Sequence, residues 1–266
     1  MNEAAVFKLR RGTTPLLISM PHVGTEIPAD QIERYVDRAA RVEDTDWFLE
    51  RLYGGIAERL GASLIVPRYS RFLIDLNRPP EDTPMYPGAS NTELCPTRFF
   101  TGDPLYREGR APDEAEKLRR RETYWRPYHD TLQGELDRLR AAHGHALLFD
   151  AHSIKSELPW LFEGQLPALN LGTVEGRSCA PAITESLGAL LGGQGRYSSV
   201  VNGRFKGGHI TRHYGRPDLN QHAVQLEMCW RCYMDEDRMS YDEARAVEVQ
   251  PLLEALLRRY LEWKPA

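Results

Sequence analysis

The sequence predicts an α/β domain of three layers, in which a mixed, mainly parallel sheet carries helices on both faces. Two kinds of segment predict this class, and they alternate along the chain. Short apolar runs are typical of buried strands, whereas longer segments have apolar residues that recur every three or four positions, as on one face of a helix. Strands interleaved with helices form mainly parallel sheets that are covered on both faces. We find no internal repeat or low-complexity tract, and we expect a single domain over residues 1–266.

The first half of the chain is expected to contain strands, a helix and a long loop. Residues 15–20 are apolar and end at a Pro-His-Val-Gly turn, as a buried strand does. Residues 44–60 carry leucine and isoleucine on one helical face. Residues 63–67 and 71–76 are the next expected strands. Residues 77–112 are rich in Pro and Gly, and a loop of that length inside a compact domain usually has a function.

The second half continues the alternation and ends in a long helix. Residues 112–142 have an apolar stripe at spacings of three and four, and Pro127 is expected to kink this helix. Residues 145–149 form an apolar run that leads into Asp-Ala-His-Ser at residues 150–153. The remaining expected elements are strands at residues 169–172, 198–202 and 223–228, and helices at residues 181–191 and 241–263.

Composition and charge exclude several classes of function. The net charge of −4 argues against a nucleic-acid partner, which would need a basic face to neutralise phosphates. The one basic cluster, residues 117–121, lies among glutamates in a helical pattern and is expected to be a solvated helix face. We see no signal peptide and no apolar run long enough to cross a bilayer, so no membrane partner is expected. The four cysteines are too sparse for a disulfide framework, and together these features predict a cytoplasmic protein.

Four polar residues are candidates for chemistry because of where they fall in the expected elements. His22 follows the first expected strand, His152 follows the central one, Asp46 lies in the first turn of a helix, and Glu227 lies within a later strand. Sheets of this class place their chemistry at the carboxyl ends of the strands. Two histidines and one carboxylate are the ligands of a catalytic zinc, which keeps a fourth position for water. A separate carboxylate would then act as general base.

Each of these residues also has a structural interpretation. A histidine after a strand is often a hydrogen-bonded part of the core. Asp46 is compatible with a simple preference for the positive end of a helix dipole, and Glu227 in an alternating strand is compatible with a solvated position. The ligands are also scattered along the chain, without a compact H-E-x-x-H motif.

Other motifs carry less weight. Cys229 and Cys232 have the spacing of redox and zinc sites but lack a second cysteine pair, so we interpret them as reduced, partly buried thiols. His209 and His213 lie four residues apart, and a substrate-contact or structural role is favoured over a metal pair. No serine-hydrolase elbow, P-loop or dinucleotide-binding glycine motif occurs.

Longer motifs follow one another in a recognisable order. They include Leu17-Ile-Ser-Met-Pro-His-Val-Gly24, Asp44-Thr-Asp-Trp47, Ser70-Arg-Phe-Leu-Ile-Asp-Leu-Asn-Arg78, Asp150-Ala-His-Ser-Ile154, Asn202-Gly-Arg-Phe-Lys-Gly-Gly-His209 and Gln225-Leu-Glu-Met228. With them the chain resembles the N-formylglutamate amidohydrolases (deformylases) of histidine degradation, over about residues 17–234. That family looks like a branch of the zinc-exopeptidase-like (phosphorylase/hydrolase-like) α/β fold.

The resemblance implies a metal centre and a general base. Relatives of that fold use two histidines and a carboxylate as ligands and a late glutamate as base. Carried over to this chain, the ligands are His22, Asp46 and His152, and the base is Glu227. Asp44 is the main rival of Asp46. The metal implied is one zinc ion, although cobalt, manganese or iron also suit these ligands.

The implied substrate is N-formyl-L-glutamate, which is hydrolysed to formate and L-glutamate. It carries two carboxylates, and the planar Arg guanidinium binds carboxylates bidentately. The residues expected to bind this substrate are Arg71, Asn77, Arg78, Asn202, Lys206 and His209. Among them Arg71, Arg78 and Lys206 are expected to hold the carboxylates, with Arg78 as first choice for the one on the side chain. The structural alternative for Arg71 and Arg78 is pairing with a nearby acid such as Asp75.

Two alternatives to this function stay open. One is a related zinc amidohydrolase that acts on another N-acyl amino acid. The other is a binding protein for small dicarboxylates that holds no metal and in which the histidines are structural. Metal content separates these classes, because such a binding protein would purify without stoichiometric zinc.

Overall fold

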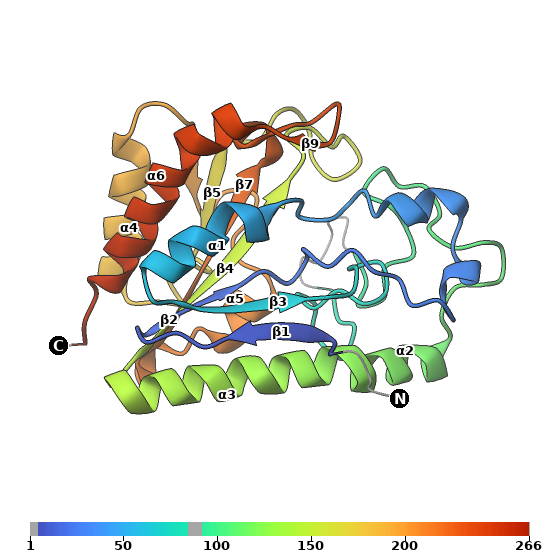
Figure 1. The fold of residues 1–266 in the computed structure, drawn as a ribbon, viewed down its shortest axis with the longest axis horizontal. Coiled ribbons are helices and arrows are strands. Elements are labelled where there is room, and N and C mark those ends of the chain that lie inside the picture. The colour runs from blue at the N-terminus through green and yellow to red at the C-terminus, as the bar shows by residue number, and fades with distance from the viewer. Residues whose placement is uncertain (1–4, 85–91, 266) are drawn as a thin grey trace.

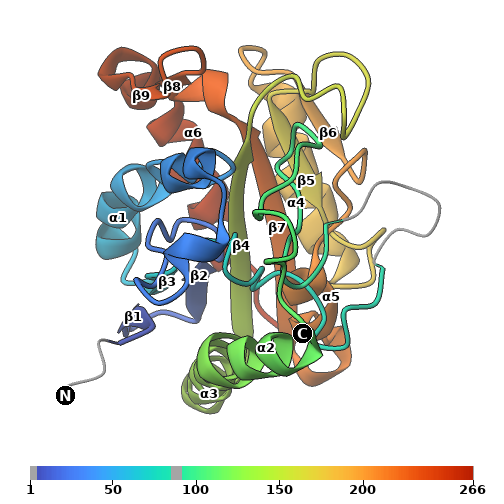
Figure 2. The same ribbon diagram turned by 90° about the vertical axis from the view of Figure 1, so that its right-hand side faces the viewer.

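A sheet lies at the centre of the molecule, between two layers of helices (Figures 1 and 2). This computed structural model describes residues 5–84 and 92–265. The strands are β1 (Phe7–Arg10), β2 (Leu16–Ser19), β3 (Ser63–Pro67), β4 (Ala146–Ile154), β5 (Leu169–Gly172), β6 (Ser199–Val201), β7 (Gln221–Cys229), β8 (Met234–Asp235) and β9 (Ser240–Tyr241). The central sheet has the strand order β1-β3-β2-β4-β7-β5-β6, and β8 and β9 form a separate pair.

The helices come from all parts of the chain. The α-helices are α1 (Leu49–Arg59), α2 (Glu114–Arg120), α3 (Arg126–His143), α4 (Pro181–Gly193), α5 (His209–Tyr214) and α6 (Glu243–Leu261). The short helices are the 3-10 turns η1 (Ile32–Arg34), η2 (Asp37–Arg41), η4 (Pro217–Leu219) and η5 (Trp230–Cys232), and the π-helical turn η3 (Arg121–Trp125). Over the described ranges, no helix is long and apolar enough to cross a membrane.

The pairing of the strands confirms a mixed, mainly parallel sheet. The four strands β3, β2, β4 and β7 are all parallel to their neighbours in this row. At one end of the row β1 pairs antiparallel with β3, and at the other β5 pairs antiparallel with β7. β6 is parallel to β5. The carboxyl ends of β2, β4 and β7 therefore meet at one edge, whereas β5 and β6 point the other way.

Alternate residues of β2 show how each face of the sheet is buried. Leu17 belongs to the apolar cluster that includes side chains of α3, whereas Leu16 and Ile18 belong to the cluster that includes α1, α4 and α6. Successive side chains of a strand point to opposite faces, so each face needs its own cover. Figure 1 shows α3 on one side of the sheet and α1, α4 and α6 on the other. The predicted three-layer fold class is confirmed.

The strand expected at residues 71–76 is wrong, because this segment is an irregular loop. Its apolar side chains are buried, but they enter two different clusters. Phe72 packs on Phe99 with ring centroids 5.3 Å apart, whereas Ile74 and Leu76 join the cluster that includes α3. A buried apolar run looks like a strand in sequence whether or not it pairs with a neighbour.

The first long helix also begins later than predicted. α1 starts at Leu49 rather than near Asp44. The Asp44 carboxylate accepts a hydrogen bond from the backbone N–H of Phe100 at 2.8 Å. The backbone N–H of Asp46 donates to the carbonyl of His22 at 3.0 Å. Both acids are thus engaged in long-range contacts, and the segment that carries them is a turn before the helix.

The helix expected over residues 112–142 is present as α2, η3 and α3 in succession. The π-helical turn comes directly before α3, which has Pro127 in its first turn. The break in regular helix therefore precedes the proline, which has no N–H to donate to the preceding turn. The basic cluster at residues 117–121 is not wholly solvated as expected. The Arg120 side chain is fully buried and donates to the hydroxyl of Tyr106 at 2.8 Å.

Two further differences and one agreement bear on the site. β4 runs past its expected end at residue 149 to Ile154, so His152 lies inside the strand rather than after it. The short helix α5 was not predicted, and it places His209 and His213 on successive turns. Of the long loop expected at residues 77–112, positions 85–91 lie outside the described residues, and the rest contains no strand or helix apart from isolated bridges.

Candidate active site

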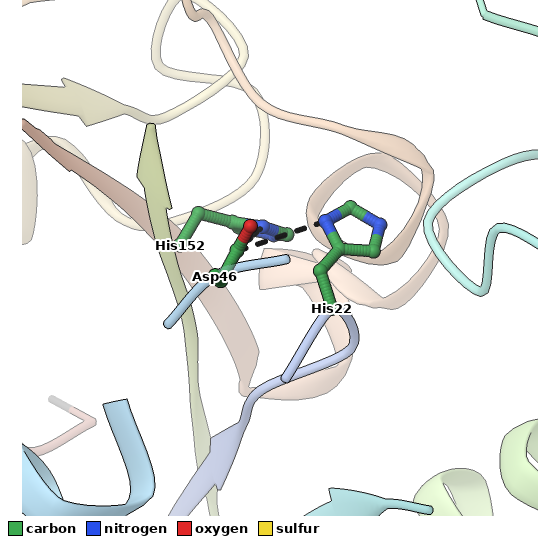
Figure 3. A group of neighbouring side chains, drawn as sticks. All are labelled: His22, Asp46 and His152. Carbon is green, nitrogen blue, oxygen red and sulfur yellow. Dashed lines mark hydrogen bonds and ion pairs between the residues drawn. The ribbon is translucent and has the colours of Figure 1, made fainter. Parts of the chain in front are cut away.

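Two histidines and an aspartate from three separate segments meet at one point (Figure 3). His22 follows β2, Asp46 precedes α1, and His152 lies in β4. One ligand atom of each lies within 4.8 Å of the other two. Asp46 Oδ2 is 3.1 Å from His152 Nδ1 and 3.7 Å from His22 Nδ1, and all three residues are buried. The three ligands expected from the sequence are therefore brought together.

Each histidine is held from behind by a second buried carboxylate. His22 Nε2 lies 2.6 Å from Asp75 Oδ1, and His152 Nε2 lies 3.1 Å from Asp150 Oδ2. A ring that gives its Nδ1 to a metal carries its proton on Nε2, and Nε2 would then donate to the carboxylate behind it. Each Nδ1 is then left with a lone pair on the side that faces Asp46. Metal-binding histidines are usually oriented by a carboxylate in this way, and the donor set fits a divalent cation such as zinc.

Arg71 fixes the carboxylate behind His22. Its Nη2 donates to Asp75 Oδ2 at 2.6 Å, and its Nη1 donates to His22 Nδ1 at 3.1 Å. The guanidinium also lies over the ring of Phe100, at 4.7 Å from its centroid. Burial alone would raise the pKa of Asp75, but the charge of Arg71 and the hydrogen bond from His22 hold that pKa well below its usual value. The structural alternative for Arg71, pairing with Asp75, is thus what the structure shows.

Asp44 does not join the histidines. Its carboxylate is tied to the backbone of Phe100, and burial raises its pKa to about 7. Asp46 Oδ2 lies 3.1 Å from His152 Nδ1 and accepts a hydrogen bond from the backbone N–H of Ser153 at 3.2 Å. The geometry therefore favours Asp46 over Asp44 as the carboxylate ligand.

Glu227 lies beside the metal-ligand group on the neighbouring strand. β4 and β7 pair in a register that sets His152 opposite Glu227. The side chain is buried, with an exposed fraction of 7%, and burial raises its pKa to about 8. Gln225 Nε2 lies 3.5 Å from Glu227 Oε2, and Gln225 Oε1 accepts a hydrogen bond from the backbone N–H of Gly208 at 2.7 Å. A carboxyl group other than the ligand is thus present next to the site.

A cavity opens over these residues. The four expected catalytic and ligand residues line it together with Arg71, Asn77, Arg78, Thr92, Phe100, Ser153, Ile154, Leu161, Arg204, Phe205, Gly208 and Gln225. Three of these are arginines, so the wall is rich in guanidinium groups around a small acidic centre. Such a lining suits an anionic small molecule.

Asn77 lines the cavity and also connects Asp75 and Asp150, the two carboxylates that support the histidines. Its Nδ2 lies 3.3 Å from Asp150 Oδ2 and 2.9 Å from His152 Nε2, while its backbone N–H donates to Asp75 Oδ1 at 2.8 Å. Its Oδ1 accepts from the backbone N–H of Ile210 at 2.8 Å. This side chain is therefore largely used in fixing the site.

Three residues expected to bind substrate do not line the cavity. Asn202 follows β6, which runs opposite to β7, and its Oδ1 accepts from the backbone of Thr173 at 2.8 Å. Lys206 pairs with Glu175 at 2.6 Å. The ring of His209 lies in α5, 5.2 Å from that of His213. The carboxyl end of β6, which Asn202 follows, points away from the carboxyl ends of β4 and β7, because β5 and β6 run in the opposite direction.

Arg204 and Gln225 are the main cavity residues that the sequence did not single out. Both lie inside motifs that carry the family resemblance, N-G-R-F-K-G-G and Q-L-E-M. Arg204 was overlooked beside Lys206, whose charge is two positions away in the same loop. Only the direction of each side chain distinguishes them, and an irregular loop has no periodicity from which to predict that direction.

Sequence comparison extends these observations to known proteins. A family model described as N-formylglutamate amidohydrolase matches residues 14–234. The chain is 49% identical over 259 residues to N-formylglutamate deformylase of Pseudomonas putida, covering 97% of this chain and 96% of that protein. It is 50% identical over 262 residues to N-formylglutamate deformylase of Pseudomonas aeruginosa, covering 97% of each.

Solved structures with a similar fold lead to the same family. The crystal structure of N-formylglutamate amidohydrolase from Ralstonia eutropha JMP134 superposes with a TM-score of 0.82 at 26% identity, covering 97% of this chain and 98% of that chain. A gene product of Agrobacterium tumefaciens shares the fold, with a TM-score of 0.72 at 18% identity and coverage of 97% and 96%. By the match to the family model and by these near full-length relatives, the chain belongs to the N-formylglutamate amidohydrolase family.

Proposed function

We propose that the protein is a metal-dependent hydrolase that converts N-formyl-L-glutamate to formate and L-glutamate. The observation that carries this proposal is the convergence of His22, Asp46 and His152, with each histidine backed by a buried carboxylate. The relatives named N-formylglutamate deformylase support the choice of substrate. The resemblance also implies that the reaction is the last step of a histidine degradation route, and the sequence features described above predict a cytoplasmic location. The four cysteines are free and buried, which fits a reducing compartment.

His22, Asp46 and His152 would hold the metal ion, which we take to be zinc. When bound there, zinc would polarise the formyl carbonyl and lower the pKa of water at the site. Asp75 and Asp150 would keep the proton of each ring on Nε2, which leaves both Nδ1 atoms unprotonated for the metal; in this structure the Nδ1 of His22 accepts from Arg71.

Glu227 is the general base in this proposal. Its carboxylate would take the proton from the attacking water and pass it to the nitrogen of the leaving amine. The arrangement fits because Glu227 lies on the strand next to His152, in register with it, and lines the same cavity. The side chain makes no ion pair within the described ranges, so the carboxylate remains available to move a proton.

Arg78 holds the α-carboxylate of the substrate in this proposal. Its Nε lies 3.9 Å from Asp75 Oδ2, which places the guanidinium close to the support of His22. It also donates to the hydroxyl of Thr92 at 2.7 Å. The α-carboxylate is the substrate carboxylate nearest to the scissile amide, so the arginine near the metal-ligand group is the one that reaches it. This revises the first choice made from the sequence, in which Arg78 held the side-chain carboxylate.

The test is formate release by the purified, zinc-loaded protein. We expect hydrolysis of N-formyl-L-glutamate, with a larger preference over N-formyl-L-leucine than over N-acetyl-L-glutamate. A pocket distinguishes one methyl group by about 1–3 kcal/mol, whereas an arginine left without its carboxylate partner loses charge-assisted hydrogen bonds. Absence of formate release contradicts the proposed function. Equal kcat/KM for the glutamate and leucine substrates would contradict the dicarboxylate pocket.

A further inference from the structure

We propose that Arg204 determines the specificity of the site by binding the side-chain carboxylate of the substrate. This inference rests on the proposed function and deepens it, because the sequence did not single out Arg204 as a binding residue. The residue follows β6 in the loop that leads to α5, and its side chain lines the cavity.

The guanidinium of Arg204 has few hydrogen bonds within the protein and is able to bind an anion. Its Nη2 donates to the carbonyl of Leu161 at 2.8 Å, and it makes no salt bridge with any described acid. The other two arginines of the cavity face a carboxylate already: Arg71 donates to Asp75 at 2.6 Å, and Arg78 lies 3.9 Å from the same group. Arg204 thus has the most unused capacity to bind a carboxylate.

Its neighbour in the loop has no such capacity. Lys206 Nζ lies 2.6 Å from Glu175 Oε1, and the Lys206 side chain does not line the cavity. The two cations are two positions apart in sequence, but only Arg204 contributes to the wall of the site. Of the two cations in the motif at residues 202–209, Arg204 is therefore the one that is placed to bind the substrate.

Contacts with the metal-ligand group and its supporting carboxylates separate the roles of Arg78 and Arg204. Arg78 lies next to Asp75, which directly supports His22, whereas Arg204 makes no hydrogen bond or ion pair with His22 or its support. In N-formylglutamate two methylene groups separate the side-chain carboxylate from the α-carbon. The arginine that does not contact this group accordingly matches the carboxylate farther from the scissile amide.

Apolar groups next to Arg204 fit the carbon chain between the two carboxylates. Ile154, Leu161 and Phe205 line the same cavity. Methylene groups of a bound substrate would pack on these side chains and displace water from them. Removal of water also strengthens the attraction between Arg204, which is exposed in the free protein, and a carboxylate. A charged end and an apolar stem are thus both accommodated.

The experiment compares N-formyl-L-glutamate with N-formyl-L-glutamine, in which the side-chain carboxylate is replaced by a neutral amide of the same shape. We expect Arg204→Gln to lower kcat/KM for N-formyl-L-glutamate by about 10- to 100-fold, mainly through KM, and to change the glutamine substrate little. Arg204→Lys keeps the charge but loses the planar fork, and it should retain part of the preference for glutamate. If the contact with Leu161 has only a structural role, Arg204→Gln would lower kcat/KM for both substrates by the same factor.

The matched control is Arg177→Gln, which removes the same charge from an exposed side chain that pairs with Glu175 and does not line the cavity. We expect this variant to keep the preference of the wild type. The assignment to Arg204 is overturned if Arg204→Gln leaves the ratio of kcat/KM for the glutamate and glutamine substrates unchanged, whether or not both values fall. Failure of the wild type to release formate from either substrate would instead contradict the proposed function.

Discussion

Asp75 Oδ1 lies 2.6 Å from His22 Nε2, on the opposite side of the imidazole ring from the nitrogen that faces Asp46. Asp75 is itself fully buried and held by Arg71 at 2.6 Å. A chain of contacts therefore runs from a buried cation through a carboxylate to a candidate ligand. This chain fixes both the orientation of the ring and the position of its proton, so metal affinity should depend on Asp75 as well as on the ligands.

Asp75→Asn should weaken zinc binding by about 10- to 100-fold, because an amide holds the imidazole proton less well than a carboxylate. The measurement is the zinc dissociation constant, determined by competition with a chelator. Asp137→Asn is the matched control, since Asp137 is an exposed residue of α3 that pairs with Arg140. Unfolding is monitored in parallel, because Asp75→Asn also leaves Arg71 without its partner. Unchanged zinc affinity in a folded variant would contradict the supporting role of Asp75.

Glu227→Gln should keep zinc bound and lower kcat by about 10²- to 10⁴-fold, since the amide has the size of the carboxylate but cannot accept the proton. The comparison is Glu243→Gln, which changes an exposed glutamate that pairs with Arg51. Metal content and turnover are measured on the same samples. Near-normal turnover would remove Glu227 from the mechanism, and loss of zinc would make it a ligand instead.

The buried His129 should make the fold less stable in mild acid. Burial lowers the pKa of His129 well below its usual 6.5, so the folded state stays neutral where the unfolded state becomes protonated. Stability from this group is therefore full above about pH 6.5 and falls as the pH drops below it. Between pH 7.5 and 5.5 the loss is about 1.4 kcal/mol.

Denaturant unfolding at the two pH values measures this effect, and His129→Gln is the comparison. The His129 ring makes hydrogen bonds at 2.8 Å to the carbonyl of Leu76 and at 2.9 Å to the hydroxyl of Tyr214, so the variant is expected to be less stable at both pH values. The informative quantity is the difference between the two pH values, which should shrink in the variant by about 1.4 kcal/mol. The same pH dependence in both proteins would show that His129 is not the group responsible.

Much of the fold could be predicted because its strands and helices have clear periodicity. The buried strand before His22 and the apolar run before His152 both occur where they were expected. The loop at residues 71–76 was misjudged, since burial of its apolar side chains comes from tertiary packing rather than from strand pairing. The start of α1 was misjudged for a related reason, because Asp44 and Asp46 make contacts with distant segments that no local pattern reveals.

The expected ligand and base residues of the candidate site come together in the structure, whereas several of the expected substrate residues do not line the cavity. His22, Asp46, His152 and Glu227 come together because three of them belong to parallel strands or the loop after one. The substrate residues depend on side-chain directions in irregular loops, and there the sequence preferred Lys206 to Arg204. Charge alone did not separate these two residues. Their interaction partners distinguish them. Lys206 forms an ion pair with Glu175, whereas among the residues described Arg204 donates a hydrogen bond only to a backbone carbonyl.

The most direct test of the account is a zinc titration of the metal-free protein, followed by formate release from N-formyl-L-glutamate. We expect no activity without metal, a linear rise with added zinc, and a plateau at one equivalent per chain, since His22, Asp46 and His152 form the one such ligand group among the residues that the structure describes. His152→Ala should give neither tight zinc binding nor activity at any point of the titration. Full activity of the metal-free wild type, or a fully active His152→Ala, would contradict the central claim.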